Sequence, residues 1–357
     1  MVLRTTKTTC SINGFQSLDV VSGTSAYSQT QLIIGDTTGS NICLSEDGNY
    51  LLIAEPNFSS LRGRISVYVK SGSTYTLSST ITGTVSGNAW GYASQGSGMA
   101  INSDGTYLAF ATRLNSPTNN YNSVRIYTRS GSTWTLQQVI QPSILSITRF
   151  GSSMFFSTTA DQLVIGNFTE SSNSGIVYMF GRSGSTWTQN ASFSGTTNSQ
   201  LGITLAVNSD ASSAFIGYGN TTGPKWCTRS GSTWTDNGSV GTGVLPFAYS
   251  TSVSNDSNYL AINNNVYYPS NTWATFSSAG SFADKNWLSK DGNYIFYEHQ
   301  FVYKRNGNDW DYFASINLVP SPRGSIGQVM SDSTGSIIVF RGGYSGETPK
   351  IYIVQKN

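Results

Sequence analysis

The stretch Arg-Ser-Gly-Ser-Thr-Trp-Thr occurs three times without change, at Arg129–Thr135, Arg182–Thr188 and Arg229–Thr235. A near copy precedes these at Lys70–Thr76, and weaker copies follow them at Pro269–Ala274 and Arg305–Asp311. Each of the strong copies follows a short run rich in β-branched and aromatic residues, such as Val124–Tyr127. Two such runs around Ser-Gly-Ser predict a β-hairpin, because glycine adopts the positive φ of a tight turn without steric cost. The chain is therefore predicted to be a repeat protein.

A second repeated element lies upstream of each hairpin, and in it an acidic turn separates two apolar runs. The copies are Leu44–Ala54, Ile101–Ala111, Phe156–Gly166, Val207–Gly217, Val253–Ile262, Leu288–Tyr297 and Met330–Phe340. The acidic turn residues are Asp47, Asp104, Asp161, Asp210, Asp256 and Asp291, with Thr334-Gly335 in the last copy. Such turns suit a strand–turn–strand in which the Asp side chain bonds its own turn backbone.

Each unit thus supplies a strand before the Asp turn, a strand after it, the apolar run and the tryptophan strand. Seven such units predict an all-β fold, a seven-bladed β-propeller that uses the 357 residues as one domain. The last unit ends with Ile351–Asn357, where the other units begin Ser-Gly-Ser. Its outer strand is therefore predicted to come from the N-terminus, since an unpaired edge invites aggregation. Counting back by the usual interval points to about Gln16–Ser22, inside a closing region of about residues 15–35 that follows a tail of about residues 1–14, and Gln31–Gly35 is the alternative.

The composition favours an uncharged polar surface. Charged residues are 11% of the chain, against a typical quarter, and the net charge is +2. This charge is too weak to indicate a nucleic-acid partner, and no apolar run approaches the ~18 residues of a membrane span. The first ten residues lack the apolar core of a secretory signal. We expect a virion or extracellular surface location, with a cytoplasmic one as the alternative.

At Phe150-Gly151-Ser152-Ser153, followed by Leu163–Asn167, the chain resembles an FG-GAP repeat, the blade type of integrin α-subunit heads and of many bacterial and viral propellers. Trp90-Gly91, Leu201-Gly202 and Phe247-Ala248 are looser versions. The resemblance implies the propeller fold, but such propellers include lectins, adhesins and scaffolds alike. The calcium loop of that family, with several Asp at alternate positions before Gly, is absent here. We therefore expect neither a metal nor another cofactor.

The sequence offers little catalytic chemistry. His299 is the only histidine, and no Gly-x-Ser-x-Gly motif accompanies it. Two of the carboxylates Glu55, Glu170, Glu298 and Glu347 could face each other across a cavity as in a glycosidase, although no separation can be derived from sequence. We predict a protein without enzymatic activity, and keep a glycan-cleaving enzyme as one alternative.

Repeated aromatic and basic residues each have two interpretations. One repeated position is occupied by Trp134, Trp187, Trp234, Trp273 and Trp310, and its regularity favours packing between blades over stacking on sugars. Arg129, Arg182 and Arg229 form either a basic rim or partners for polar groups on neighbouring strands. We favour the second interpretation.

Partner binding is predicted on one face. In a propeller, the turn between the second and third strands lies on the same face as the crossover to the next blade, here called the loop face, and the Asp turns lie on the other. Loops of variable length on a rigid scaffold are where binding usually resides. The long insertions Glu55–Gly63, Leu77–Gly98 and Thr112–Ser123 place the contact surface over blades one to three. The candidate binding residues of the loop face are Glu55, Arg113, Tyr121, Glu170, Asn220, Glu298, His299 and Arg341.

The leading hypothesis is a non-enzymatic protein-interaction or structural propeller, serving as a structural or attachment component at a virion surface. Its partners would be other proteins, such as capsid or surface components, or glycans. A carbohydrate-binding lectin or adhesin is the first alternative. The sequence names neither the partner nor the glycan.

Overall fold

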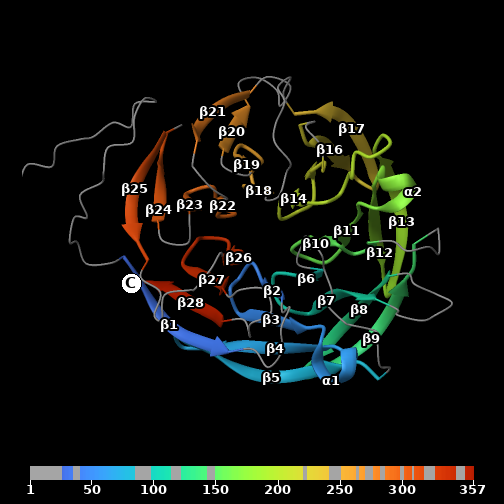
Figure 1. The fold of residues 1–357 in the computed structure, drawn as a ribbon, viewed down its shortest axis with the longest axis horizontal. Coiled ribbons are helices and arrows are strands. Elements are labelled where there is room, and N and C mark those ends of the chain that lie inside the picture. The colour runs from blue at the N-terminus through green and yellow to red at the C-terminus, as the bar shows by residue number, and fades with distance from the viewer. Residues whose placement is uncertain are drawn as a thin grey trace, which may run out of the picture.

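Within the described residues, the chain forms seven four-stranded antiparallel sheets arranged around a central axis (Figure 1). The computed structural model describes residues 26–34, 41–84, 98–113, 122–142, 149–219, 223–240, 251–262, 265–269, 276–281, 286–297, 301–307, 309–316, 326–342 and 350–357. This arrangement confirms the predicted all-β, seven-bladed β-propeller. In the part of the chain so described, no helix is long and apolar enough to cross a bilayer.

Blades 1 to 3 follow one another in chain order, and each runs from an inner to an outer strand. Blade 1 consists of β2 (Asn41–Leu44), β3 (Tyr50–Glu55), β4 (Arg64–Ser71) and β5 (Thr74–Thr82). Blade 2 consists of β6 (Met99–Ile101), β7 (Tyr107–Arg113), β8 (Asn122–Ser130) and β9 (Thr133–Ile140). Blade 3 consists of β10 (Ser153–Phe156), β11 (Gln162–Asn167), β12 (Ile176–Ser183) and β13 (Thr186–Ser194). Two single helical turns, α1 (Phe58–Leu61) and α2 (Glu170–Asn173), join the second and third strands of blades 1 and 3.

Blades 4 to 6 repeat the same order with shorter strands. Blade 4 consists of β14 (Leu205–Val207), β15 (Ser213–Ile216), β16 (Lys225–Ser230) and β17 (Thr233–Ser239). Blade 5 consists of β18 (Thr251–Val253), β19 (Leu260–Ile262), β20 (Asn265–Pro269) and β21 (Phe276–Ser281). Blade 6 consists of β22 (Asn286–Leu288), β23 (Tyr294–Tyr297), β24 (Phe301–Asn306) and β25 (Asp309–Ser315).

Blade 7 combines the two ends of the chain. Its three inner strands are β26 (Ile326–Ser331), β27 (Ile337–Gly342) and β28 (Lys350–Lys356), and its outer strand is β1 (Tyr27–Ile34). In Figure 1 the blue β1 lies beside the red β28, and Tyr27 pairs with Lys356. Closure by an N-terminal strand is thus confirmed, and the strand overlaps the alternative Gln31–Gly35. The first choice, Gln16–Ser22, lies outside the described residues.

The first two strands of every blade are joined by the same six-residue turn, whose positions we number 1 to 6, as in Ser45 to Tyr50. At position 1 a Ser, Asn or Asp side-chain oxygen accepts the backbone N–H of position 6 in all seven blades. Position 4 has a positive φ throughout, which explains the glycines of blades 1, 2, 6 and 7. In blades 1, 2, 4, 5 and 6 the Asp of position 3 accepts the N–H of position 5, as predicted.

Two blades depart from the predicted turn. In blade 3 the acidic residue is at position 5, where the Asp161 carboxylate accepts the hydroxyls of Ser157 and Thr159. In blade 7 the acidic residue is at position 1, where Asp332 replaces the usual Ser or Asn. The sequence analysis sets the last copy apart by its Thr334-Gly335, but it groups Asp161 with the Asp residues of the other turns, because Asp161 also lies between the two apolar runs.

The repeated arginine fastens the Ser-Gly-Ser turn to the Asp turn of its own blade. Arg129 Nε and Nη2 donate to the carbonyls of Gly105 and Asp104, at 2.7 and 3.3 Å, and Nη1 donates to that of Gly131 at 2.8 Å. Arg182 and Arg229 make the same three kinds of bond. The interpretation as structural partners is confirmed, although the partners are backbone carbonyls. Three of the five N–H donors of each guanidinium are used within its own blade, which favours the structural interpretation over a basic rim.

The repeated tryptophan packs between blades. Trp187 of blade 3 is 3% exposed and lies edge-on to Tyr107 of blade 2, with ring centroids 6.3 Å apart. Trp310 of blade 6 lies edge-on to Tyr259 of blade 5 at 6.0 Å. Trp134 and Trp234 belong to similar clusters, and Trp273 lies outside the described residues. The packing interpretation is confirmed for the described tryptophans.

The Phe-Gly pair has a comparable structural role. Phe150 is buried, and Gly151 has a φ of +84° where the chain enters blade 3. A Cβ at Gly151 would lie 2.8 Å from side-chain atoms of Ala111 and Val124 in blade 2, so only glycine fits. Leu201-Gly202 repeats this at blade 4, with a φ of +88° at Gly202. Trp90-Gly91 and Phe247-Ala248 lie outside the described residues.

Candidate functional site

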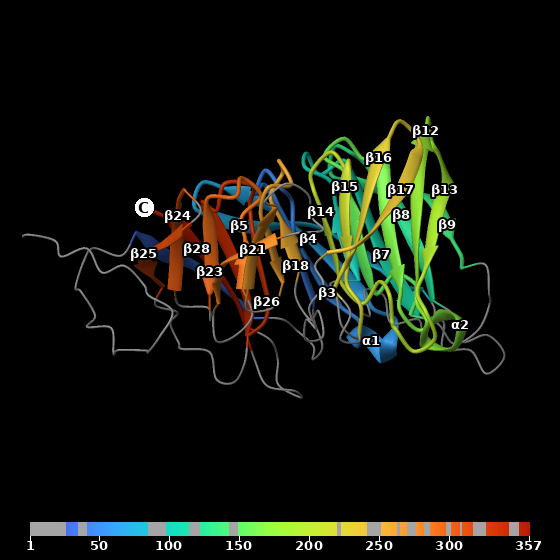
Figure 2. The ribbon, with the colours of Figure 1, turned by 90° about the horizontal axis from the view of Figure 1, so that it is seen from above.

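The two faces of the ring differ in construction. Figure 2 shows the propeller from the side, with α1 and α2 on the loop face. The connections of this face join the second to the third strands and cross over between blades. The opposite face, here called the Asp-turn face, carries the six-residue turns and the Ser-Gly-Ser turns. The predicted binding residues belong to the first of these faces.

Glu55, a predicted binding residue at the end of β3, is 2% exposed. Its Oε2 accepts from Arg64 Nε at 2.7 Å and lies 2.5 Å from Arg64 Nη2. The Arg64 guanidinium in turn lies 4.1 Å from the ring centre of Phe58 in α1. Because the carboxylate is buried and engaged in an ion pair, Glu55 shapes the start of the blade 1 loop and is not presented to a partner.

Glu170, at the start of α2, is also 2% exposed. Its Oε2 accepts from the Tyr178 hydroxyl at 2.7 Å and from the Asn167 side-chain amide. Asn167 Oδ1 accepts the backbone N–H of Arg149 at 3.0 Å, so the network ties α2 to the entry of blade 3. Glu170 is therefore a structural residue of the loop face and not a surface contact.

The other predicted residues are only partly placed. Arg341 in β27 is half-buried; burial lowers the pKa of its guanidinium, and its Nε has no hydrogen-bond partner among the described residues. The backbone of Arg113 ends β7 opposite Asn122. Four of the predicted residues lie outside the described part of the chain, namely Tyr121, Asn220, Glu298 and His299. The described residues therefore show the scaffold of this surface, and the residues that bind a partner stay a prediction.

The loop face of blades 1 and 3 contains strained backbone that the sequence analysis missed. Ser59, Ser60 and Leu61 in α1 have φ values of +49°, +59° and +61°. The equivalent residues of α2 are Ser171, Ser172 and Asn173, with φ values of +54°, +59° and +59°. Consecutive left-handed residues are costly for side chains with a Cβ, and such strain concentrates at functional sites. The shared Ser-Ser-x-x-Gly spacing was the available sequence signal.

The strained turn of blade 3 is fastened to the crossover into blade 4. The backbone N–H groups of Gln200 and Leu201 donate to the carbonyls of Asn173 and Ser174, at 2.8 and 2.9 Å. The Ser199 hydroxyl donates to the same Ser174 carbonyl at 2.8 Å. The loop is therefore held in one shape, which is the condition for a specific binding surface.

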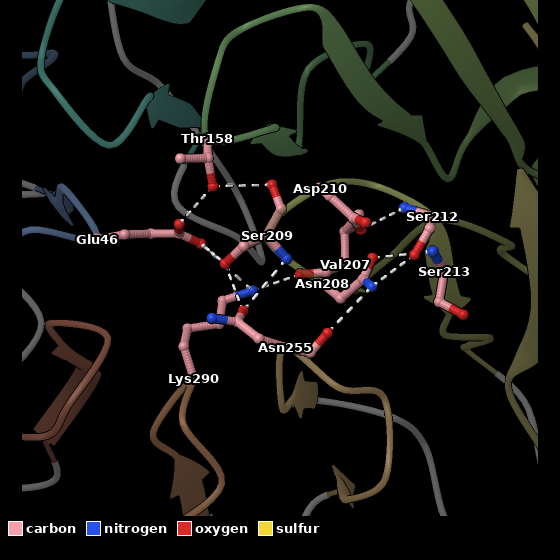
Figure 3. A network of polar contacts seen from close by, with 10 residues as sticks. All are labelled: Glu46, Thr158, Val207, Asn208, Ser209, Asp210, Ser212, Ser213, Asn255 and Lys290. Carbon is pink, nitrogen blue, oxygen red and sulfur yellow. Dashed lines mark hydrogen bonds and ion pairs between the residues drawn. The ribbon is translucent and has the colours of Figure 1, made fainter. Parts of the chain in front are cut away.

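Around the axis, the turns of the Asp-turn face are hydrogen-bonded to one another (Figure 3). Backbone bonds join the position 2 residue of one turn to a neighbouring turn, including Ser333 N–H to Glu46 O at 2.7 Å and Thr158 N–H to Ser209 O at 2.7 Å. Side chains at position 2 of different blades also meet, and Glu46 accepts from the hydroxyls of Thr158 and Ser209. We call the residues Glu46, Thr158, Ser209, Asn255 and Lys290 the axial network. Sequence analysis missed it because position 2 is not constant among the copies and five residue types occupy it.

The described residues offer little for metal or thiol chemistry. No group of three or more His, Cys, Asp or Glu side chains among them could hold a metal ion. Cys43 and Cys227 are buried free thiols, and burial raises the pKa of each to about 12. Since the thiolate is the reactive form, these two cysteines are inert at neutral pH.

Comparisons with known proteins support the fold only. Neither a protein-family model nor a curated protein sequence matches the chain. The β-propeller domain of Cps50 (Swd1) from Myceliophteria thermophila is 9% identical with a TM-score of 0.59, over 93% of this chain and all of that one. U3-55K is 12% identical with a TM-score of 0.57, over 91% and 99%. A putative 6-phosphogluconolactonase from Bacteroides uniformis is 12% identical with a TM-score of 0.54, over 76% and 83%.

Proposed function

We propose that this chain is a non-enzymatic interaction propeller that binds a protein partner through its loop face. The fold suits a protein-interaction scaffold. The single observation that carries the proposal is the contrast between the two faces. On the Asp-turn face the groups of the repeated turns bond one another. On the loop face the connections differ in length and two of them hold strained turns, of which that of blade 3 is bonded to the crossover into blade 4.

Two of the carboxylates that suggested a glycosidase, Glu55 and Glu170, are bonded within their own blades. Glu55 forms an ion pair with Arg64, and Glu170 accepts from Tyr178 and Asn167. A glycosidase requires two carboxyl groups facing a common cavity, one of them available as an acid. Neither side chain is presented in that way, and the other two candidates, Glu298 and Glu347, lie outside the described residues.

The proposed context is the surface of a virus particle, where the chain would be a structural or attachment component with FG-GAP-type blades. The low content of charged residues, 11% of the chain, supports the surface context. The close packing of Gly151 and Gly202 against the preceding blade supports the blade type. The partner in this context is another surface or capsid protein.

A loop deletion tests the choice of face. Thr112 and Ser123 bracket the blade 2 loop, and their hydroxyls are 2.7 Å apart and buried. Replacing residues 114–121 with Asn-Gly keeps this pair and leaves a tight hairpin turn. The melting temperature should change little because long surface loops contribute little to stability. Co-sedimentation of the variant with purified particles should fall at least tenfold.

A matched control changes the other face. Ser73, Ser132 and Ser185 are exposed residues of the Ser-Gly-Ser turns, and we expect the triple Ser→Glu variant to bind as the wild type does. Full binding by the loop variant together with loss in the Glu variant would show that the wrong face was chosen. Glycan-array signals competed by free sugar would replace the proposal with a lectin, and turnover of oligosaccharides would replace it with an enzyme.

A further inference from the structure

Glu46 reaches the axis of the propeller from blade 1. Its Oε1 accepts from the Ser209 hydroxyl of blade 4 at 2.6 Å, and its Oε2 accepts from the Thr158 hydroxyl of blade 3 at 3.0 Å. Blades 1 and 4 are separated by at least two others around a ring of seven, so their side chains meet only near its centre. Figure 3 shows the carboxylate extended toward these groups.

Lys290 completes the surroundings of this carboxylate from blade 6. Its Nζ lies 3.9 Å from Glu46 Oε1, donates to the carbonyl of Val207 in blade 4 and lies 4.5 Å from the ring centre of Phe155 in blade 3. Burial lowers the pKa of the Lys290 ammonium, and the nearby Glu46 carboxylate opposes this shift. The Val207 carbonyl and the Phe155 ring position the ammonium independently of Glu46.

The remaining position 2 residues show that Glu46 is an exception. Five of the seven are small and uncharged, namely Ser103, Thr158, Ser209, Asn255 and Ser333. Only Glu46 and Lys290 are long and charged, and they have opposite signs. Each of the two hydroxyls has a second acceptor within reach: Asn255 Oδ1 for Ser209, and the Ser209 carbonyl, at 3.0 Å, for Thr158. Each hydroxyl has one proton, and the charged oxygen of Glu46 is the stronger acceptor for it.

We propose that Thr158, Ser209 and Lys290 form a carboxylate-binding site on the axis of the Asp-turn face, and that Glu46 occupies it as an internal ligand. Two hydroxyl donors and one ammonium converge on one carboxylate, and the three come from three blades. The site is at the surface, because Glu46 and Lys290 retain 16% and 18% of their side-chain exposure. When Glu46 is absent, a small organic carboxylate takes its place.

Chemical rescue tests the proposal. Glu46→Ser installs the residue found at the equivalent Ser103 and Ser333, and leaves Lys290 without its counter-ion. The probe is sodium acetate, titrated against sodium chloride at equal ionic strength, with thermal unfolding as the readout. Acetate should stabilise Glu46→Ser saturably, and the folding equilibrium shifts about tenfold at an acetate concentration ten times its Kd. Saturation-transfer NMR should show the acetate methyl signal only with this variant.

Two controls keep the outcome decisive. Glu46→Gln fills the site with an uncharged isostere, so acetate and chloride should affect it equally, as they should the wild type. Lys290→Gln added to Glu46→Ser should abolish the rescue. If Glu46→Ser does not fold alone, its refolding yield from urea in acetate against chloride gives the same comparison. Equal effects of the two salts on Glu46→Ser, or rescue that survives Lys290→Gln, would overturn the proposal.

Discussion

At two of the interfaces between neighbouring blades, a glutamine side chain makes two hydrogen bonds with the backbone of one residue in the next blade. We call this pair of bonds a glutamine clasp, and the other described interfaces, or seams, lack it. Gln138 in β9 accepts the Trp187 backbone N–H at 2.8 Å and donates to the Trp187 carbonyl at 3.0 Å, joining the outer strands of blades 2 and 3. Gln31 in β1 makes the same pair of bonds with Tyr75 in β5, at 2.7 and 2.9 Å. The second clasp therefore joins the closing blade to blade 1.

The equivalent positions elsewhere hold shorter side chains. Gln31 pairs with Ile353 and Gln138 with Ile126, each beside a bulge in the outer strand. The same place is taken by Ser79 in blade 1, Ala191 in blade 3 and Ala314 in blade 6. Ser79 Oγ and the indole nitrogens of Trp134 and Trp234 have no hydrogen-bond partner among the described residues. At this position of the outer strand, the propeller therefore joins two pairs of neighbouring blades through a glutamine side chain, and in the other three blades named here a side chain too short to reach the next blade takes its place.

Removing a clasp should have the largest effect on stability. Gln31→Ala and Gln138→Ala each remove two bonds to backbone groups, which should lower the free energy of unfolding by about 2 kcal/mol. Urea unfolding followed by tryptophan fluorescence measures this loss. Gln189→Ala is the matched control, since Gln189 is exposed on the outer strand β13 and should change stability by less than about 0.5 kcal/mol. Equal losses in all three variants would contradict the comparison.

Adding a clasp should have a smaller effect of the opposite sign. Ser79→Gln places a longer amide side chain opposite Trp134. If it adopts the geometry of Gln138, it can bond the backbone N–H and the carbonyl of Trp134. After the entropy of ordering the side chain, the gain should be about 0.5–1 kcal/mol, or roughly 1–3 °C in melting temperature. Differential scanning calorimetry of Ser79→Gln against Ser79→Ala measures it. No gain over the alanine variant would mean that the clasp depends on more than side-chain length.

The smallest effect should come from a turn of the closing blade. Asp332 is buried, and burial raises the pKa of its carboxyl, although the Ile337 N–H and the Thr334 hydroxyl partly offset this. Asp332→Asn keeps an acceptor for Ile337, as Asn102 and Asn208 do for Tyr107 and Ser213. It should raise the free energy of unfolding by about 0.5 kcal/mol at pH 7, because it removes a buried charge whose hydrogen bonds offset only part of its desolvation cost.

The pH dependence of that gain has a defined sign. A carboxyl whose pKa is raised in the folded state destabilises the fold once it ionises in the unfolded chain, above its ordinary pKa of about 4. The advantage of Asp332→Asn should therefore vanish below that pH and grow as the pH rises through the raised pKa. Melting temperatures of both proteins between pH 3 and 8 measure this. An advantage that is independent of pH would point to packing instead of charge.

Repetition made the fold predictable from sequence. The Asp turn and the Ser-Gly-Ser hairpin each occur in several copies, and each copy carries its own physical reason in an Asp acceptor or a glycine with positive φ. The missing outer strand of the last unit likewise predicted closure by the N-terminus. The location of that strand was less certain, because the bulge between Gln29 and Gln31 interrupts its alternation.

The site residues were less predictable because they depend on what does not repeat. Glu55 and Glu170 looked like surface acids, but each finds its partner within the same blade once the loop folds back. Glu46 looked like one more residue before an Asp turn, and its role follows only from the ring that brings blades 3, 4 and 6 to it. Contacts across a closed ring have no signature in local sequence.

The pairing of β1 with β28 has a consequence for how the chain folds. Residues near opposite ends must meet, and the Tyr27 hydroxyl already donates to the carbonyl of Gly335, 308 residues away. During synthesis the first six blades emerge before β28 does, so the ring stays open and β1 remains unpaired until then. Contacts of such long range form late and slowly. We therefore expect pairing of β1 with β28 to limit the rate of ring closure, and the open ring that precedes this pairing to be the species most prone to aggregation.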